Sequence, residues 1–204
     1  MGPLDLYQTA VSKGDIQSDV AQLQAMERLQ SLYLALTKQE NEPGLIAKLF
    51  AKPKRELIPG LYFWGGVGRG KTFLMDLFFD SLPFEQKSRM HFHRFMRHVH
   101  RALTDLQGEA DPLRKIALDF ADKNRVLCFD EFFVSDITDA MILAGLLEVL
   151  FENGVTLVAT SNVEPVNLYE NGLQRSKFLP AIALIEKNTQ ILNVDSGTDY
   201  RLRV

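Results

Sequence analysis

The sequence contains little that would mark an exported or membrane protein. Cys128 is its single cysteine, so no disulfide can form within the chain. No run of about 18 apolar residues occurs, so the sequence predicts no membrane-spanning helix. The N-terminal stretch lacks both a secretory apolar segment and an Arg-rich, acid-poor transit signature, because Asp5, Asp15 and Asp19 come early. We therefore expect a cytoplasmic protein without a transmembrane segment.

The chain also lacks a strong excess of either charge. Its formal net charge is −3, so the overall charge does not favour binding to nucleic acid or anionic lipid. No stable nucleic-acid complex is expected. Neither internal repeats nor low-complexity segments occur. With 46% hydrophobic and 24% charged residues, the composition is that of a globular protein with one sizeable core.

One glycine-rich segment, GGVGRGKT at residues 65–72, matches the phosphate-binding loop G-x-x-x-x-G-K-[ST]. An apolar run at residues 61–64 precedes it, as expected of a buried strand, and apolar residues at helical spacing follow over 73–82. In such a loop, backbone N–H groups and the helix N-terminus face a phosphate group. The expected nucleotide-binding residues are Gly65, Gly66, Val67, Gly68, Arg69, Gly70, Lys71, Thr72 and Phe73.

Within this loop, Lys71 would reach the β- and γ-phosphates and the Thr72 hydroxyl would bind Mg²⁺. A second motif supplies acids, because an apolar strand ends abruptly in Asp130 and Glu131. The carboxyl ends of strands are where α/β sheets bind ligands. We expect Asp130 to orient Mg²⁺ and Glu131 to accept a proton from the attacking water.

Two further polar residues are weaker candidates. Asn162 follows an apolar strand over residues 155–159 and would either bond the γ-phosphate or the attacking water, or cap the next helix. Arg175 follows the break at Asn171-Gly172, and is either an ordinary surface residue or projects toward the nucleotide of a neighbouring subunit. The residues alone leave both alternatives open.

Five strand segments alternate with helices, which indicates an α/β fold with a mostly parallel sheet covered on both faces. All four histidines fall between His91 and His100. A metal site there is less expected than packed or hydrogen-bonded rings, because no complete ligand set accompanies them. The remaining predicted helices cover residues 18–38, with Ser18 as N-cap, 96–106, 112–123, and 136–151, with Ser135 as N-cap. Further strands are predicted over 89–95, 125–129 and 190–194. A helical stretch over 164–185 is expected to be interrupted near Asn171-Gly172 and at Pro180.

Among phosphate-loop proteins, a GTPase would carry an Asn-Lys-x-Asp run, and none is present. A small-molecule kinase usually has an arginine-rich lid, whereas the Asp130-Glu131 pair suits activation of water. The residues therefore favour an ATP hydrolase. An ATP-dependent module linked to nucleic acid, such as a helicase loader, and a structural scaffold with little hydrolysis are the alternatives.

The segments GLYFWGGVGRGKTFLMDLF, HFHRFM, VLCFDEFFVSDITDA, LVATSN and NGLQRSKFLPAI closely resemble, in order, the Afg-type AAA+ ATPases. The resemblance implies an ATPase that uses ATP and Mg²⁺ and, in bacteria, acts at the division site by reducing the stability of FtsZ polymers. It further implies that residues 65–72 are Walker A, that Asp130 and Glu131 are Walker B, that Asn162 is sensor 1, and that Arg175 is an arginine finger of a homo-oligomer.

The resemblance covers about residues 57–204, whereas residues 1–56 match the family only loosely. We therefore expect an N-terminal helical extension and linker over 1–56, and an AAA+ core over 57–204. The family normally adds a C-terminal helical lid after the last strand. The sequence stops at Val204, where that lid would begin, so the expected core is truncated before it.

Overall fold

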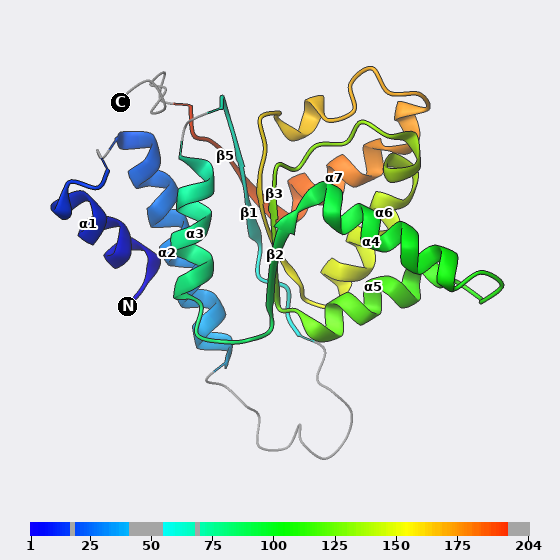
Figure 1. The fold of residues 1–204 in the computed structure, drawn as a ribbon, viewed down its shortest axis with the longest axis horizontal. Coiled ribbons are helices and arrows are strands. Elements are labelled where there is room, and N and C mark those ends of the chain that lie inside the picture. The colour runs from blue at the N-terminus through cyan, green and yellow to red at the C-terminus, as the bar shows by residue number, and fades with distance from the viewer. Residues whose placement is uncertain (17–18, 41–54, 68–69, 196–204) are drawn as a thin grey trace, which may run out of the picture.

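A computed structural model describes residues 1–16, 19–40, 55–67 and 70–195 (Figure 1). The α-helices are α1 (Pro3–Lys13), α2 (Val20–Glu40), α3 (Lys71–Ser81), α4 (Phe92–Asp105), α5 (Pro112–Lys123), α6 (Ile137–Glu152) and α7 (Leu179–Asn188). The strands are β1 (Gly60–Trp64), β2 (Lys87–His91), β3 (Val126–Asp130), β4 (Thr156–Thr160) and β5 (Thr189–Asn193). Two 3₁₀ turns, η1 (Pro165–Asn167) and η2 (Arg175–Lys177), precede α7.

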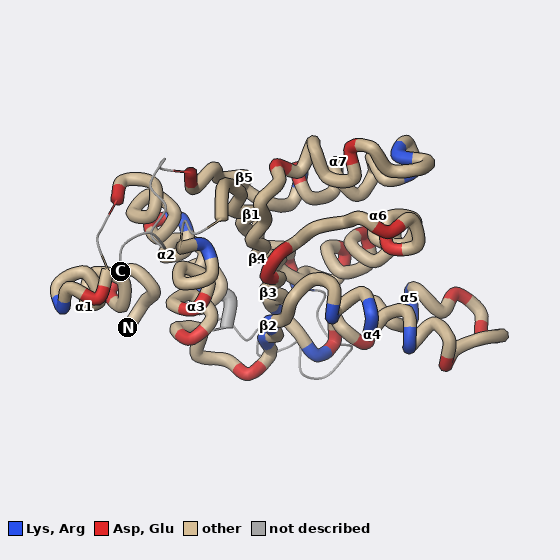
Figure 2. Tube along the Cα trace, turned by 45° about the horizontal axis from the view of Figure 1, so that its top comes forward, with Lys and Arg blue, Asp and Glu red and all other residues tan. Residues whose placement is uncertain are grey.

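The five strands form one sheet in the order β2-β3-β4-β1-β5, and every neighbouring pair is parallel. Helices cover both faces: α1, α2 and α3 lie on one side, and α4 to α7 on the other (Figures 1 and 2). The predicted fold class is thus confirmed. Because all strands run the same way, the residues that follow β1, β3 and β4 meet at one edge of the sheet.

Side chains alternate between the two faces with the period of a strand. On β1, Leu61 and Phe63 belong to the core beneath α1 to α3, whereas Tyr62 belongs to the core beneath α4 to α7. On β3, Cys128 faces the first core and Phe129 the second. The central strands are buried on both faces, which explains their unbroken apolar sequences.

Two predicted boundaries were wrong. The strand predicted over residues 89–95 ends at His91, and α4 begins at Phe92. Phe92, Phe95 and Val99 are buried in the same core at helical spacing, which decides the boundary. Helix α6 is capped by Asp136, whose carboxylate accepts a hydrogen bond from the Thr138 N–H, rather than by Ser135.

The N- and C-terminal parts also differ from expectation. Helix α1 was not predicted, although Pro3 in its first turn and Gly14 after its end are typical helix boundaries. Pro180 lies in the first turn of α7 and so begins this helix rather than interrupting it. Helix α2 buries Met26 and Leu29 against the sheet, in the same core as α3. Its expected N-cap, Ser18, lies outside the described residues.

No helix in the described ranges is long and apolar enough to span a membrane. The four histidines have ordinary contacts. His91 and His93 stack with ring centroids 5.7 Å apart, His98 packs edge-on against Phe120, and His100 Nε2 lies 2.6 Å from an oxygen of Asp139. No group of three or more His, Cys, Asp or Glu side chains suited to a metal ion occurs in the described part of the chain.

Candidate functional site

The glycine-rich loop joins β1 to the first turn of α3. Gly65 and Gly70 have φ values of +142° and +80°, and Gly70 is the residue immediately before the helix. Residues with a side chain rarely adopt these backbone conformations, which accounts for glycine at both positions. Gly66 and Val67 lie in the described part of the loop, whereas the predicted residues Gly68 and Arg69 lie outside the described residues.

Lys71, the first residue of α3, points back toward this loop. Its ammonium Nζ donates hydrogen bonds to the carbonyl oxygens of Gly65 at 2.6 Å and Gly66 at 2.8 Å. It also donates to Oδ1 of Asn162 at 3.1 Å. Thr72 is the next residue in this first helical turn and is exposed. Phe73 is partly buried against the core beneath α3. The loop, α3 and the segment after β4 therefore meet at Lys71.

Asn162 was expected either to act in the site or to cap a helix. Its side chain accepts the hydrogen bond from Lys71, and the residue before η1 is Glu164. The capping alternative is therefore wrong. Asn162 also lines a cavity of about 540 Å³ together with Glu131. The other lining residues are His93, Phe132, Phe133, Ser135, Asp139 and Val163.

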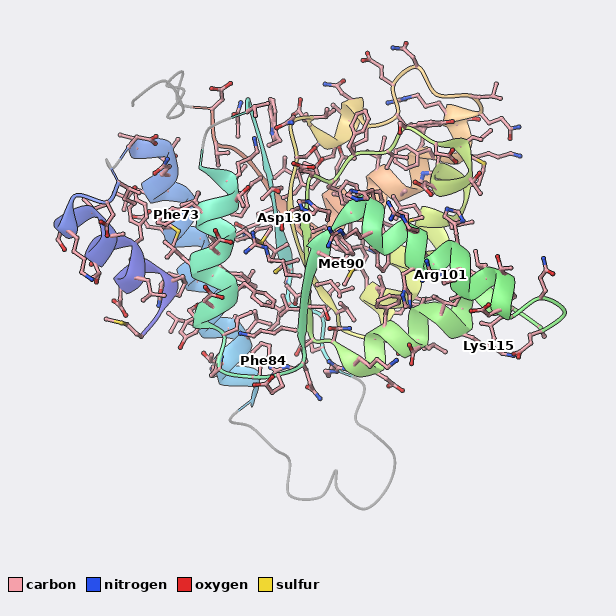
Figure 3. The ribbon with its side chains drawn as sticks, in the orientation of Figure 1. Phe73, Phe84, Met90, Arg101, Lys115 and Asp130 are labelled. Carbon is pink, nitrogen blue, oxygen red and sulfur yellow. The ribbon has the colours of Figure 1, made fainter. Side chains whose placement is uncertain are left out.

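Asp130, labelled in Figure 3, is the last residue of β3 and is buried. Its carboxylate lies against the guanidinium of Arg89 on β2. Arg89 Nε lies 2.8 Å from Oδ2 of Asp130, and Nη2 lies 3.2 Å from Oδ1. The third guanidinium nitrogen, Nη1, bonds Asp76 of α3. Burial lowers the pKa of Arg89, but the hydrogen bonds that its guanidinium donates to Asp130 and Asp76 outweigh this effect, so that the pKa is raised. Arg89 thus fixes the Asp130 carboxylate.

Glu131 differs sharply from its neighbour. Its backbone is left-handed, with φ +53°, and its side chain is 75% exposed. The Glu131 N–H donates to Oγ1 of Thr160 at 3.3 Å, and His91 Nδ1 lies 3.8 Å from its carboxylate. The turn at Glu131 separates a buried carboxylate from an exposed one, as the two expected roles require.

Arg175 does not join this group. It lies in η2, where Nη2 donates to the carbonyl oxygen of Val166 at 2.6 Å. Its Nε is buried and has no hydrogen-bond partner among the described residues. The cavity shared by Glu131 and Asn162 is lined by other residues. Within one subunit, the structure therefore brings together Lys71, Asn162, Asp130 and Glu131 at the carboxyl edge of the sheet, without Arg175.

Arg89, His91 and Thr160 were not predicted to be neighbours of the two acids. In the parallel register, His91 is opposite Asp130 and Arg89 is opposite Cys128. A basic residue on the strand beside β3 would have been a signal, but strand order cannot be read from local patterns. Thr160 is the last residue of β4, and only pairing with β3 brings its hydroxyl to Glu131.

Comparison with known proteins identifies the family of this chain and proteins that share its fold. The model of the AFG1-like ATPase family matches residues 1–204. Cell division protein ZapE of Escherichia coli (strain K12) is 54% identical over 211 residues, which cover 98% of this chain and 56% of that protein. This chain spans about half the length of the curated relatives it matches.

Two solved structures share the fold at low sequence identity. DnaI superposes with a TM-score of 0.62 at 19% identity, covering 91% of this chain and 87% of that one. AMPPCP-bound DnaA from Aquifex aeolicus has a TM-score of 0.62 at 13% identity and covers 93% of this chain and 51% of that one. At these identities the likeness concerns the fold alone.

Proposed function

Because the chain belongs to the AFG1-like ATPase family, we propose that it binds ATP with Mg²⁺ and hydrolyses ATP to ADP and phosphate. One arrangement carries the proposal. Lys71 of the glycine-rich loop bonds Asn162 at 3.1 Å, and Asn162 lines the same cavity as Glu131. Asn162 thus connects a cationic anchor to a cavity with an exposed carboxylate, and attack of water on a bound phosphate needs these three kinds of group.

The loop residues bind the phosphates. The N–H groups of the loop and the N-terminus of α3 attract the negative charge, and Lys71 exchanges its present carbonyl partners for phosphate oxygens. Thr72 and Asp130 would hold Mg²⁺, because both offer the hard oxygen ligands that this ion prefers. When bound, Mg²⁺ neutralises charge on the phosphates. Arg89 and the Thr72 backbone on α3 keep these ligands in place.

Glu131 is the proposed general base. Its carboxylate is exposed beside the cavity and accepts a proton from the attacking water, while Asn162 orients that water or the γ-phosphate. We propose Arg175 as an arginine finger that acts on the nucleotide of a neighbouring subunit in a homo-oligomer. Its position away from Lys71 and Glu131 agrees with a role between subunits.

Variants separate binding from chemistry. We expect Glu131→Gln to keep ATP affinity while turnover falls by about 10²-fold or more. Lys71→Ala should lose ATP binding itself. Glu148→Gln on α6, an exposed carboxylate outside the site, is the matched control and should behave as wild type. Binding of a fluorescent ATP analogue and phosphate release measure the two properties. Wild-type turnover by Glu131→Gln would refute the assignment.

We further propose that the protein acts in the cytoplasm at the division site and lowers the stability of FtsZ polymers in the presence of ATP. The proposal is supported by the 54% sequence identity between this chain and a cell division protein. FtsZ polymers should sediment less when the protein and ATP are added, and Glu131→Gln should abolish this effect. Sedimentation velocity with and without ATP tests the homo-oligomer. ATP turnover stimulated by single-stranded DNA and not by FtsZ would instead favour a helicase loader.

A further inference from the structure

Helix α4 has one apolar face and one basic face. Phe92, Phe95, Met96 and Val99 are buried in the core, whereas the basic side chains His93, Arg94, Arg97, His98 and Arg101 are all exposed. No acidic residue occurs in α4 before Asp105, its last residue. The helix therefore presents a continuous basic surface on a chain whose net charge is −3. We call Arg94, Arg97 and Arg101 the arginine face.

The three arginines lack the partners that similar side chains have nearby. Within the described part of the chain, none of them forms an ion pair or a side-chain hydrogen bond, and Arg101 does not pair with Asp105 four residues later. On the neighbouring helix α5, every basic side chain forms an ion pair: Arg114 with Glu152, Lys115 with Glu109, and Lys123 with Asp119. The contrast is between two adjacent helices of one protein (Figure 1).

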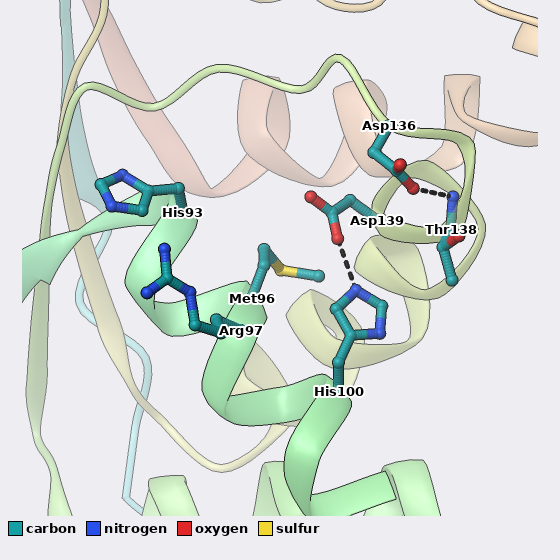
Figure 4. Close-up of a pocket in the computed structure, with 7 residues that line it drawn as sticks. All are labelled: His93, Met96, Arg97, His100, Asp136, Thr138 and Asp139. Atoms are coloured by element: carbon teal, nitrogen blue, oxygen red, sulfur yellow. Dashed lines mark hydrogen bonds and ion pairs between the residues drawn. The ribbon is translucent and has the colours of Figure 1, made fainter. Parts of the chain in front are cut away.

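Acids beside the arginine face are already engaged. A cavity of about 410 Å³ between α4 and α6 contains Arg97, His100, Asp136 and Asp139 in its lining (Figure 4). Asp139 bonds His100 at 2.6 Å, and Asp136 bonds the Thr138 N–H at 2.6 Å. In Figure 4 the Arg97 guanidinium lies beside His93 and apart from the His100–Asp139 pair.

The arrangement is unfavourable for the isolated helix. Arg94 and Arg97 are three residues apart, and Arg97 and Arg101 are four apart, so like charges are neighbours on the helix surface and destabilise it. Folding alone gives no reason to keep three such residues together. An anionic partner would remove the repulsion and would bind the planar guanidinium groups through two-point hydrogen bonds.

We propose that the arginine face binds an acidic segment of a partner polypeptide. Arg94 and Arg101 are separated by about 10 Å along the helix axis, a distance that a short acidic peptide spans. Nucleic acid fits less well, because single strands are held largely by aromatic stacking and both phenylalanines of α4 are buried. The negative net charge of the chain also opposes the binding of a long polyanion such as nucleic acid.

The test compares two triple variants that remove equal charge from adjacent helices. The first carries Arg94→Gln, Arg97→Gln and Arg101→Gln; the control carries Arg114→Gln, Lys115→Gln and Lys123→Gln. Fluorescence anisotropy measures binding of a labelled glutamate-rich peptide to each chain. The α4 variant should bind about tenfold or more weakly, and the control should change by less than about twofold. Added NaCl should weaken the wild-type complex.

Two results would overturn the proposal. Equal losses in both triple variants would mean that only overall charge matters. Tighter binding of a labelled oligothymidylate, lost in the α4 variant alone, would make this a nucleic-acid surface. Thermal unfolding checks that the variants fold, and the three single variants, each with a smaller loss, serve if a triple variant does not. Because the measurement needs no ATP, its failure is separate from failure of the proposed ATPase activity.

Discussion

Arg89 is the residue on which the acidic end of the site depends. It lies on β2, and its guanidinium contacts Asp130 on β3 and Asp76 on α3. Asp130 is 7% exposed, so its charge would be costly without a cationic partner. A planar fork with several donors can bind both carboxylates at once, which a lysine ammonium cannot do with the same geometry. Arg89 therefore holds Asp130 between β2 and α3, and we expect it to influence the site through that carboxylate.

We expect Arg89→Ala to lower the free energy of unfolding by about 2–3 kcal/mol, because it leaves Asp130 buried and unpaired. Arg89→Lys should cost less, since a positive charge remains. Urea unfolding measures both. A positioning role adds a second expectation: both variants should need more Mg²⁺ for tight binding of a fluorescent ATP analogue. An unchanged Mg²⁺ requirement, together with lost stability, would leave Arg89 with a purely structural role.

Cys128 illustrates burial in the centre of the sheet. It is fully buried on β3, and burial is the main cause that raises the pKa of its thiol to about 12. Since the thiolate is the reactive form, the native protein should react very slowly with a thiol-specific disulfide reagent at pH 8. In denaturing urea the single thiol should react fully. Rapid reaction of the native protein would show that β3 opens locally.

At the scale of single elements, the start of α6 gives a pH-dependent prediction. The hydrogen bond from the Thr138 N–H is the first cause that lowers the pKa of Asp136. A carboxylate with a lowered native pKa stabilises the fold above its unfolded pKa of about 3.9, and this stabilisation is lost as pH falls through the native value.

We therefore expect Asp136→Ala to lower the thermal midpoint at pH 7, while Asp136→Asn, an equally good cap, should lower it less. The difference between wild type and Asp136→Asn should shrink as pH falls below about 4, where the carboxylate of the unfolded chain takes up a proton, and should vanish once pH is below the lowered native pKa. Thermal unfolding followed by circular dichroism at several pH values measures this. A difference that stays constant down to pH 2 would contradict the role of the ionised carboxylate.

The elements also show what local sequence can and cannot predict. The β1–loop–α3 unit was predicted well because the glycine-rich motif and its apolar flanks constrain backbone and side chains together. The end of β2 was misplaced because the half-buried residues of this edge strand show no clear alternation that would mark where it stops. The helical spacing of Phe92 and Phe95, both buried in one core, places them in α4 instead. Helix α1 was missed because it buries only two side chains, Pro3 and Tyr7, so that its apolar face is short.

For the site, the residues that follow motif strands were predicted, and their partners were not. Lys71, Asp130, Glu131 and Asn162 each follow a recognisable strand, and the family pattern assigns each a role that remains proposed. Arg89 could not be placed beside Asp130, because this contact depends on β2 lying next to β3 in the sheet. Strand order is a property of the whole chain, so no local pattern contains it.

At the scale of the whole molecule, the sheet joins two helical layers. The core beneath α1 to α3 contains Met26 and Leu29 of α2, and the opposite core contains Phe95 of α4. Residues 1–56 and 57–204, expected to be an extension and a core, share the first of these packed clusters through α2, β1 and α3. If the two layers unfold together, disruption of either one should affect the entire chain.

Leu29→Ala and Phe95→Ala test this from opposite faces. Both side chains are essentially fully buried, so each variant should lose about 3 kcal/mol or more of unfolding free energy. Because the sites lie on different faces, the losses should add in the double variant. Urea unfolding is followed by circular dichroism, which reports all helices, and by fluorescence of Trp64, the only tryptophan, on β1. Coincident transitions are expected for every variant. Loss of circular dichroism before fluorescence in Leu29→Ala alone would instead mean that the N-terminal helices unfold as a separate unit.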